Sequence, residues 1–159
     1  MPMIELTTRI NAPCDRVFDL ARSVDLHVDS TAHTGERAVA GVTSGLIGLG
    51  QEVTWRARHF GVVQHLTSRI TQFDRPRHFR DSMVRGAFRR FDHDHLFTED
   101  GPVTIMIDRF DYMSPWGILG RVADSLFLRR YMQRLLEVRN AVLCTAAESE
   151  AWRKYLKPS

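Results

Sequence analysis

The chain has 159 residues, of which 43% are hydrophobic and 26% charged, a length and composition typical of one globular domain. Its 22 Lys and Arg residues are spread along the chain against 19 Asp and Glu residues, which disfavours a nucleic-acid partner because such proteins gather their basic residues in a patch. No apolar run approaches the roughly 20 residues that span a bilayer, and no signal-peptide pattern opens the chain, so we expect one cytoplasmic domain over residues 1–159 with no membrane span.

The first thirty residues predict a strand followed by two short helices. Apolar and polar side chains alternate over residues 4–10, which is typical of a strand. Asn11 is a candidate N-cap and Pro13 suits the first turn of a helix, so a short amphipathic helix is expected after them. Residues 24–30 predict a second short helix.

The middle of the chain predicts an antiparallel meander. Strands are expected over residues 34–39 (a weak candidate), 51–60, 62–73, 78–85, 88–97 and 103–113. Short turns separate most of them, for example at Gly61 and Gly86. A glycine-rich loop over residues 41–50 carries Leu46, Ile47 and Leu49, which either edge a cavity or pack locally.

From about Ile118 the pattern becomes helical. Apolar residues spaced three and four apart form one stripe, which Arg139 interrupts: Leu128, Tyr131, Met132, Leu135, Leu136, Val142, Leu143 and Ala146. Because neither glycine nor proline occurs between Gly120 and Pro158, we expect one helix of roughly thirty residues, about 45 Å long. Trp116, just before this helix, is expected at the rim of a pocket.

This order of elements resembles the START-like superfamily, also called the polyketide cyclase–dehydrase (SRPBCC) or helix-grip superfamily. The opening strand and the run from Asn11 to Asp19 (NAPCDRVFD) carry the resemblance. Residues 76–81, 86–88 and 91–97 look like a bacterial subgroup of ligand-binding members, some of them labelled cell-division inhibitors. The resemblance covers residues 4 to about 147.

The resemblance implies an α+β fold. In it, a curved antiparallel sheet of six to seven strands wraps around a long C-terminal helix, and two short helices follow the first strand. It also implies a cavity between the sheet and that helix. Members of the superfamily bind lipids, hormones or polyketides in it, and some catalyse cyclisation, dehydration or hydrolysis. Fold alone does not choose among these functions.

Histidines and carboxylates are the candidate functional groups. Period-two alternation puts Phe91, His93, His95 and Phe97 on one face of their strand, and the aromatic rings favour an inward orientation. On the strand over residues 103–113 both faces are half apolar. We favour an inward Asp108, because its face carries large side chains throughout.

Four polar side chains then meet in the cavity if the predicted faces point inward: Asp81, His93, His95 and Asp108, with His59 as a possible fifth. A histidine beside a carboxylate in an apolar cavity can act as a general acid or base. Buried His–Asp pairs also occur simply to satisfy one another, and we favour this structural role. A metal site at His93 and His95 with Asp81 or Asp108 is a weaker alternative, because paired histidines on a strand are common by chance. We expect no metal and no cofactor.

The sequence therefore predicts a protein that binds a small hydrophobic ligand, lipid-, polyketide- or aromatic-like. Its expected site residues are Trp55, His59, Phe79, Asp81, Phe91, His93, His95, Phe97, Met106, Asp108, Phe110, Tyr112, Leu128, Met132 and Leu135. One alternative is a cyclase- or dehydratase-type enzyme that uses His93 or His95 with Asp108 or Asp81. Another is an interaction module that affects cell division, which requires an exposed apolar patch and no useful cavity. The oligomeric state, monomer or homodimer, stays open.

Overall fold

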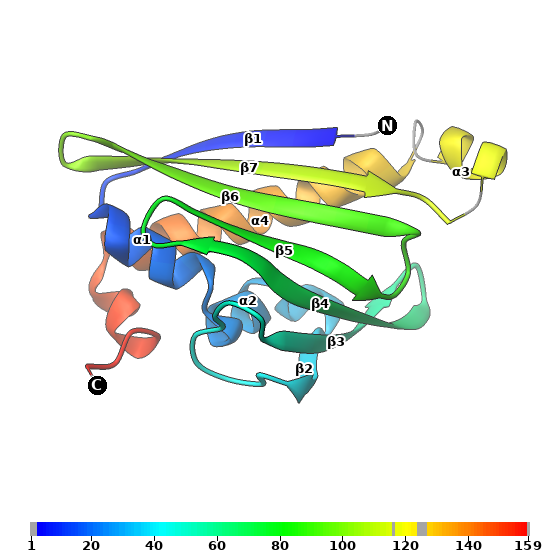
Figure 1. Ribbon diagram of the computed structural model, residues 1–159, viewed down its shortest axis with the longest axis horizontal. Coiled ribbons are helices and arrows are strands. Elements are labelled where there is room, and N and C mark those ends of the chain that lie inside the picture. Colours follow the sequence, from blue (N-terminus) through cyan, green and yellow to red (C-terminus); the bar gives the residue numbers. More distant parts are fainter. Residues whose placement is uncertain (1–2, 116, 124–126, 159) are drawn as a thin grey trace.

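In the part of the chain that the structure describes, seven antiparallel strands form one curved sheet, which wraps around a C-terminal helix (Figure 1). The computed structural model describes residues 3–115, 117–123 and 127–158. The strands are β1 (Met3–Ile10), β2 (Arg37–Gly41), β3 (Glu52–His59), β4 (Val62–Asp74), β5 (His78–Arg85), β6 (Arg90–Asp100) and β7 (Val103–Met113). Their order in the sheet is β1-β7-β6-β5-β4-β3-β2, so the first strand of the chain pairs with the last. The predicted meander is confirmed, with strand ends shifted by up to three residues.

Two short helices follow β1, as predicted. They are α1 (Cys14–Ala21) and α2 (Val24–Ser30). Ser23 caps α2, because its side chain accepts a hydrogen bond from the Leu26 amide at 3.2 Å. The expected Asn11 cap is wrong: α1 starts directly after Pro13, and the Asn11 amide instead donates to Glu148 Oε1 at 2.8 Å.

The helical region after the sheet is α3 (Gly117–Ala123) and α4 (Arg129–Glu148). The expectation of one helix of about thirty residues is therefore too long, since α4 has 20 residues. The part that would join α3 to α4, residues 124–126, lies outside the described residues, as does Trp116. None of the described helices is long and apolar enough to cross a membrane.

α4 lies against the concave face of the sheet, where it buries Leu136, Leu143, Ala146 and Ala147 (Figure 1). The apolar stripe at helical spacing explains this orientation, since these side chains fall on one face. Arg139 also lies on this face and is only 5% exposed. It continues the stripe rather than interrupting it, contrary to expectation.

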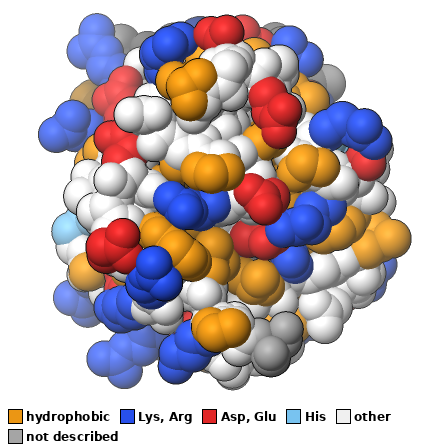
Figure 2. All heavy atoms as spheres, turned by 90° about the vertical axis from the view of Figure 1, so that its left-hand side faces the viewer, with side chains coloured by type: hydrophobic (Ala, Val, Ile, Leu, Met, Phe, Trp, Pro, Cys, Tyr) orange, Lys and Arg blue, Asp and Glu red, His pale blue; other side chains and the backbone are white. Residues whose placement is uncertain are grey.

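Two 3₁₀ turns complete the described structure, Ala32–Thr34 after α2 and Glu150–Lys154 after α4. The second belongs to the C-terminal tail, which packs back on α1 and α2. Arg16 stacks over the Trp152 ring at 4.3 Å, and the Tyr155 hydroxyl donates to Asp29 at 2.6 Å. Figure 2 shows the end of the molecule that lies at the left of Figure 1, where basic, acidic and apolar side chains are interleaved.

Candidate functional site

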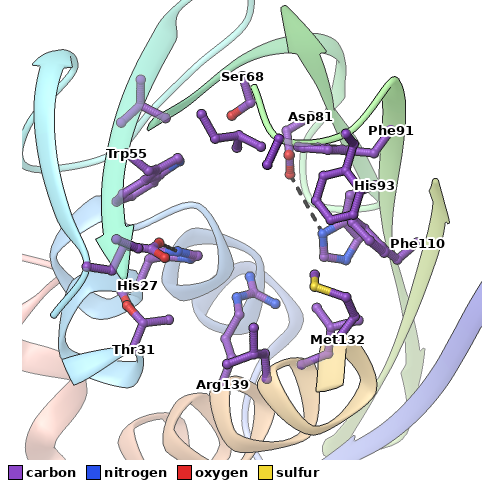
Figure 3. A pocket seen from close by; sticks show the side chains of 18 of the residues that line it. His27, Thr31, Trp55, Ser68, Asp81, Phe91, His93, Phe110, Met132 and Arg139 are labelled. Atoms are coloured by element: carbon purple, nitrogen blue, oxygen red, sulfur yellow. Dashed lines mark hydrogen bonds and ion pairs between the residues drawn. The ribbon is translucent and has the colours of Figure 1, made fainter. Parts of the chain in front are cut away.

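A cavity of about 260 Å³ lies between the concave face of the sheet and α4. In Figure 3, Trp55, His27 and Thr31 lie on one side of it and Phe91, His93 and Phe110 on the other, while Met132 and Arg139 reach in from α4. Eleven of the expected site residues line this cavity: Trp55, His59, Phe79, Asp81, Phe91, His93, His95, Phe110, Leu128, Met132 and Leu135.

The other four expected site residues do not line the cavity. Phe97 and Met106 are buried in a core cluster with Phe18, because α1 packs on β6 and β7 and fills that part of the concave face. Tyr112 is fully buried against the rings of Phe88 and Phe110. Asp108 is fully buried behind the histidines that do reach the wall. The alternating pattern identified these side chains as inward-facing but did not distinguish a filled interior from a hollow one.

Leu136 lines the cavity, as its place in the apolar stripe of the helix predicts. Several other wall residues were not predicted from the sequence, namely His27, Glu36, Leu66, Ile70, Phe88, Tyr131 and Arg139. Leu66 and Ile70 share one face of β4, and Arg139 lies in an otherwise apolar helical stripe. These positions in the sequence pattern could have predicted that all three face the interior. Of the three apolar residues in the glycine-rich loop, Ile47 lines the cavity and Leu49 is exposed.

Strand pairing brings the predicted histidines and carboxylates together. Asp81 of β5 stands opposite His93 of β6, and Asp108 of β7 stands opposite His95. His93 Nε2 lies 2.9 Å from Asp108 Oδ1, and His95 Nε2 lies 3.1 Å from Asp81 Oδ2. Each histidine also lies near the other carboxylate: His95 Nδ1 is 3.0 Å from Asp108 Oδ1, and His93 Nδ1 is 3.9 Å from Asp81 Oδ2. We call these four residues the His–Asp cluster.

α4 supplies the partners that hold Asp108 in place. Asn140 Nδ2 donates to Asp108 Oδ2 at 2.7 Å. Arg139 Nη1 lies 3.5 Å from Asp108 Oδ1, and its Nη2 donates to the Ala21 carbonyl at 2.9 Å. Asp108 therefore touches two imidazoles, an amide and a guanidinium, so its burial leaves neither carboxylate oxygen unpaired.

Burial and charge act in opposite directions on the His–Asp cluster. Burial alone would raise the pKa of Asp108, but hydrogen bonds and charge from His93 and His95 hold that pKa well below its usual range. Burial, reinforced by the neighbouring His95, lowers the pKa of His93. Burial also opposes a charge on His95, yet its carboxylate neighbours Asp108 and Asp81 outweigh burial and raise its pKa. The pKa values of the two imidazoles therefore shift in opposite directions, so His93 is neutral and His95 favours its proton.

A second polar group lines the cavity on the side of Trp55. His59 Nδ1 lies 2.5 Å from the Tyr131 hydroxyl, and His27 pairs with Glu36. The His27 ring packs on the Trp55 ring, with centroids 4.3 Å apart. Burial lowers the pKa of His59, although Glu36 opposes the shift. The remaining wall between these two polar groups is chiefly aliphatic and aromatic.

The geometry allows three kinds of chemistry. The cavity can bury an apolar molecule and orient it through its polar groups. His93 is neutral beside a carboxylate and reaches the wall, as a general acid or base would need. Asp81, His93 and His95 also offer one ligand atom each within 4.8 Å of one another, as a metal site would need.

Comparison with solved structures defines the class of fold. Protein TTHA0849 of Thermus thermophilus is 20% identical with a TM-score of 0.72, over 92% of this chain and 99% of that chain. A START superfamily protein from Mycobacterium smegmatis is 10% identical with a TM-score of 0.69, over 92% and 97% of the two chains. Ginseng major latex-like protein 151 from Panax ginseng is 14% identical with a TM-score of 0.68, over 93% and 98%.

The chain therefore has a helix-grip fold, similar to that of the START superfamily protein, and the resemblance seen in the sequence is confirmed for the fold. No family model and no curated protein matches the sequence. At 10–20% identity the structural likeness is one of fold, and the function is argued from the site.

Proposed function

We propose that this chain, acting as a single domain, binds a small, largely apolar molecule in the cavity between the sheet and α4. The observation that carries the proposal is the cavity itself, which is bounded mainly by aromatic and aliphatic side chains, with a smaller number of polar ones. Ligand sites in proteins have this composition, with volumes of about 300–1,000 Å³. A cavity of about 260 Å³ lies just below that range and therefore suits a compact ligand.

The polar groups favour a ligand with at least one hydrogen-bond donor. Asp81 is ionised, because His95 and the neighbouring charges outweigh the burial that would raise its pKa. Its side chain is 21% exposed, so it still presents an acceptor toward the cavity. A hydroxyl or amine of the ligand would pair with it, whereas an entirely apolar ligand would leave this carboxylate without a new partner.

Filling the cavity tests the proposal. Ala57 of β3 lines the cavity and is 6% exposed, so the isobutyl group of Ala57→Leu would occupy the space of the ligand. We expect about tenfold weaker binding of an uncharged apolar fluorescent dye such as N-phenyl-1-naphthylamine, which corresponds to about 1.4 kcal/mol. The matched control is Ala141→Leu on the exposed side of α4, which should bind the dye as the unmodified chain does. Equal binding by all three proteins would contradict the proposal.

Native mass spectrometry of the chain from its own host identifies the ligand class. A discrete small molecule released near one per chain supports binding and supplies a compound for assays. A released compound that the protein converts to another species would favour the second candidate function, acid–base catalysis by His93 with Asp81 or Asp108. The neutral imidazole at the cavity wall is the observation that favours this candidate.

A further inference from the structure

We propose that Asp81, His93 and His95 form a binding site for one divalent transition-metal ion at the wall of the cavity. Among the described residues, these three are brought together by two neighbouring strands, and their ligand atoms lie within 4.8 Å of one another. Two imidazole nitrogens and one carboxylate oxygen are the donor set of many zinc and non-haem iron sites. The inference goes beyond ligand binding and does not depend on it.

Distances in the cluster match what an ion would need. A tetrahedral ion with ligands at about 2.1 Å places its ligand atoms roughly 3.4 Å apart. Asp81 Oδ2 lies 3.1 Å from His95 Nε2 and 3.9 Å from His93 Nδ1, on either side of that value. The two imidazole nitrogens lie within 4.8 Å of each other, so the rings would also have to approach one another, by up to about 1.4 Å, to bring all three atoms to coordination distance.

Asp108 supplies the feature that distinguishes a metal site from a chance cluster. Histidines that bind metals usually donate their other ring N–H to a carboxylate, which fixes the orientation of the ring. Here the other nitrogens, His93 Nε2 and His95 Nδ1, lie 2.9 and 3.0 Å from the same oxygen of Asp108. His93 Nε2 has hydrogen-bond geometry to this oxygen, whereas His95 Nδ1 lies close to it without forming a hydrogen bond. The buried carboxylate therefore orients the His93 ring and faces the back of the His95 ring.

The support continues into α4. Asn140 donates to Asp108 and Arg139 lies beside it, so the orienting carboxylate is itself held on two sides. Asp81, His93 and His95 all line the cavity, so the remaining coordination positions of an ion would open toward it.

Charge indicates what would fill an open position. An imidazole must be neutral to bind a metal, so an ion would displace the proton that His95 favours. With both imidazoles neutral, the carboxylates of Asp81 and Asp108 against the guanidinium of Arg139 leave one negative charge. A divalent ion reverses this to one positive charge in an apolar cavity. An anionic or strongly polarised oxygen of a ligand or of water would then complete the coordination, because an uncompensated buried charge is unfavourable.

Calorimetric titration of the metal-stripped, untagged chain with Zn²⁺ alone tests the site. We expect one ion per chain and a much weaker affinity in Asp81→Asn, which replaces a ligand by a poor one of the same shape. The loss should exceed the roughly 10- to 100-fold expected for Asp108→Asn, which only removes the orienting carboxylate. The matched control is Asp94→Asn, since Asp94 lies between the two histidines but pairs with Arg80 and His78 on the other face of the sheet.

Equal Zn²⁺ affinity in Asp81→Asn and the unmodified chain, or no binding at all, would overturn the proposal. Should Asp81→Asn fail to fold, the histidine side-chain NMR spectrum of the unmodified chain decides. Zn²⁺ should move the ring signals of His93 and His95 and leave those of His78 in place; any other pattern refutes the site. Dye binding measured on the same samples separates this outcome from the proposed function, because the cavity can bind a dye whether or not it binds an ion.

Discussion

The two faces of the sheet over β5, β6 and β7 carry the same kinds of residues in different surroundings. On the convex face, Asp94 accepts two hydrogen bonds from Arg80, at 2.9 and 2.8 Å, and lies 2.7 Å from His78. On the concave face, Asp108 meets two histidines, Asn140 and Arg139. The side chain of Asp94 is 18% exposed and that of Asp108 is fully buried.

The comparison shows that the burial of a His–Asp–Arg group, and not only its residue types, determines its energetic contribution and its pKa values. Partly hydrated ion pairs gain little net free energy, because water already solvates both partners. In the interior, each polar group depends on its protein partners, and a missing partner leaves a desolvated charge. The His–Asp cluster is therefore expected to matter more for the stability of the fold, and burial and charge shift the pKa values of its members more strongly.

The largest expected effect is the loss of stability on removing the buried carboxylate. Asp108→Asn should lower the free energy of unfolding by about 3–5 kcal/mol, because it removes the buried negative charge that faces Arg139 and two imidazoles and places an NH2 donor among other donors. Asp94→Asn, the same change on the convex face, should cost about 1 kcal/mol or less. Urea unfolding followed by circular dichroism compares the two. Similar losses would show that burial does not separate the two faces.

The next largest effect concerns stability as a function of pH, on which the two histidines of the His–Asp cluster should act in opposite directions. The pKa of His93 is lowered, so its contribution to stability is present above its unfolded pKa of about 6.5 and is lost as the pH falls below that value. The pKa of His95 is raised, so its contribution is present below about 6.5 and is lost as the pH rises through its folded pKa.

Single variants resolve these two contributions. Stability differences between the unmodified chain and His93→Gln should shrink from pH 6.5 to pH 5, and those for His95→Gln should shrink from pH 6.5 to pH 8. Each change is expected on the order of 1 kcal/mol per unit of pKa displacement. Urea unfolding across pH 5–8 measures both. Slopes of the same sign in the two variants would refute the assignment of a neutral His93 beside a protonated His95.

Period-two alternation was sufficient to predict the strands and the inward face of β6, because aromatic rings flank both histidines. It did not determine which face of β7 points inward, because Ile105 and Ile107 make the opposite face nearly as apolar as the face of Asp108. The register that sets Asp108 opposite His95 follows from pairing along the whole sheet. That pairing cannot be predicted from the sequence of either strand alone.

Arg139 and the filled part of the cavity show the other limit. A charged residue in an apolar stripe reads as an interruption, yet Arg139 is buried because Ala21 and Asp108, both distant in the sequence, offer it acceptors. Phe97 and Met106 alternate like true wall residues, but α1 covers them. Such contacts between distant segments decide which inward side chains border empty space.

The smallest expected effect lies on the convex face and should disappear in salt. Arg80→Met removes the partner of Asp94 and should cost less than about 1 kcal/mol at low ionic strength, since the Arg80 side chain is 32% exposed. In 1 M NaCl the screening length falls to about 3 Å, so the difference from the unmodified chain should fall within error. The deficit of Asp108→Asn should persist in the same buffer, because ions do not reach a fully buried carboxylate. Urea unfolding at both salt concentrations measures the four values, and a salt-insensitive Arg80→Met deficit would mean that the convex pairs act as buried ones do.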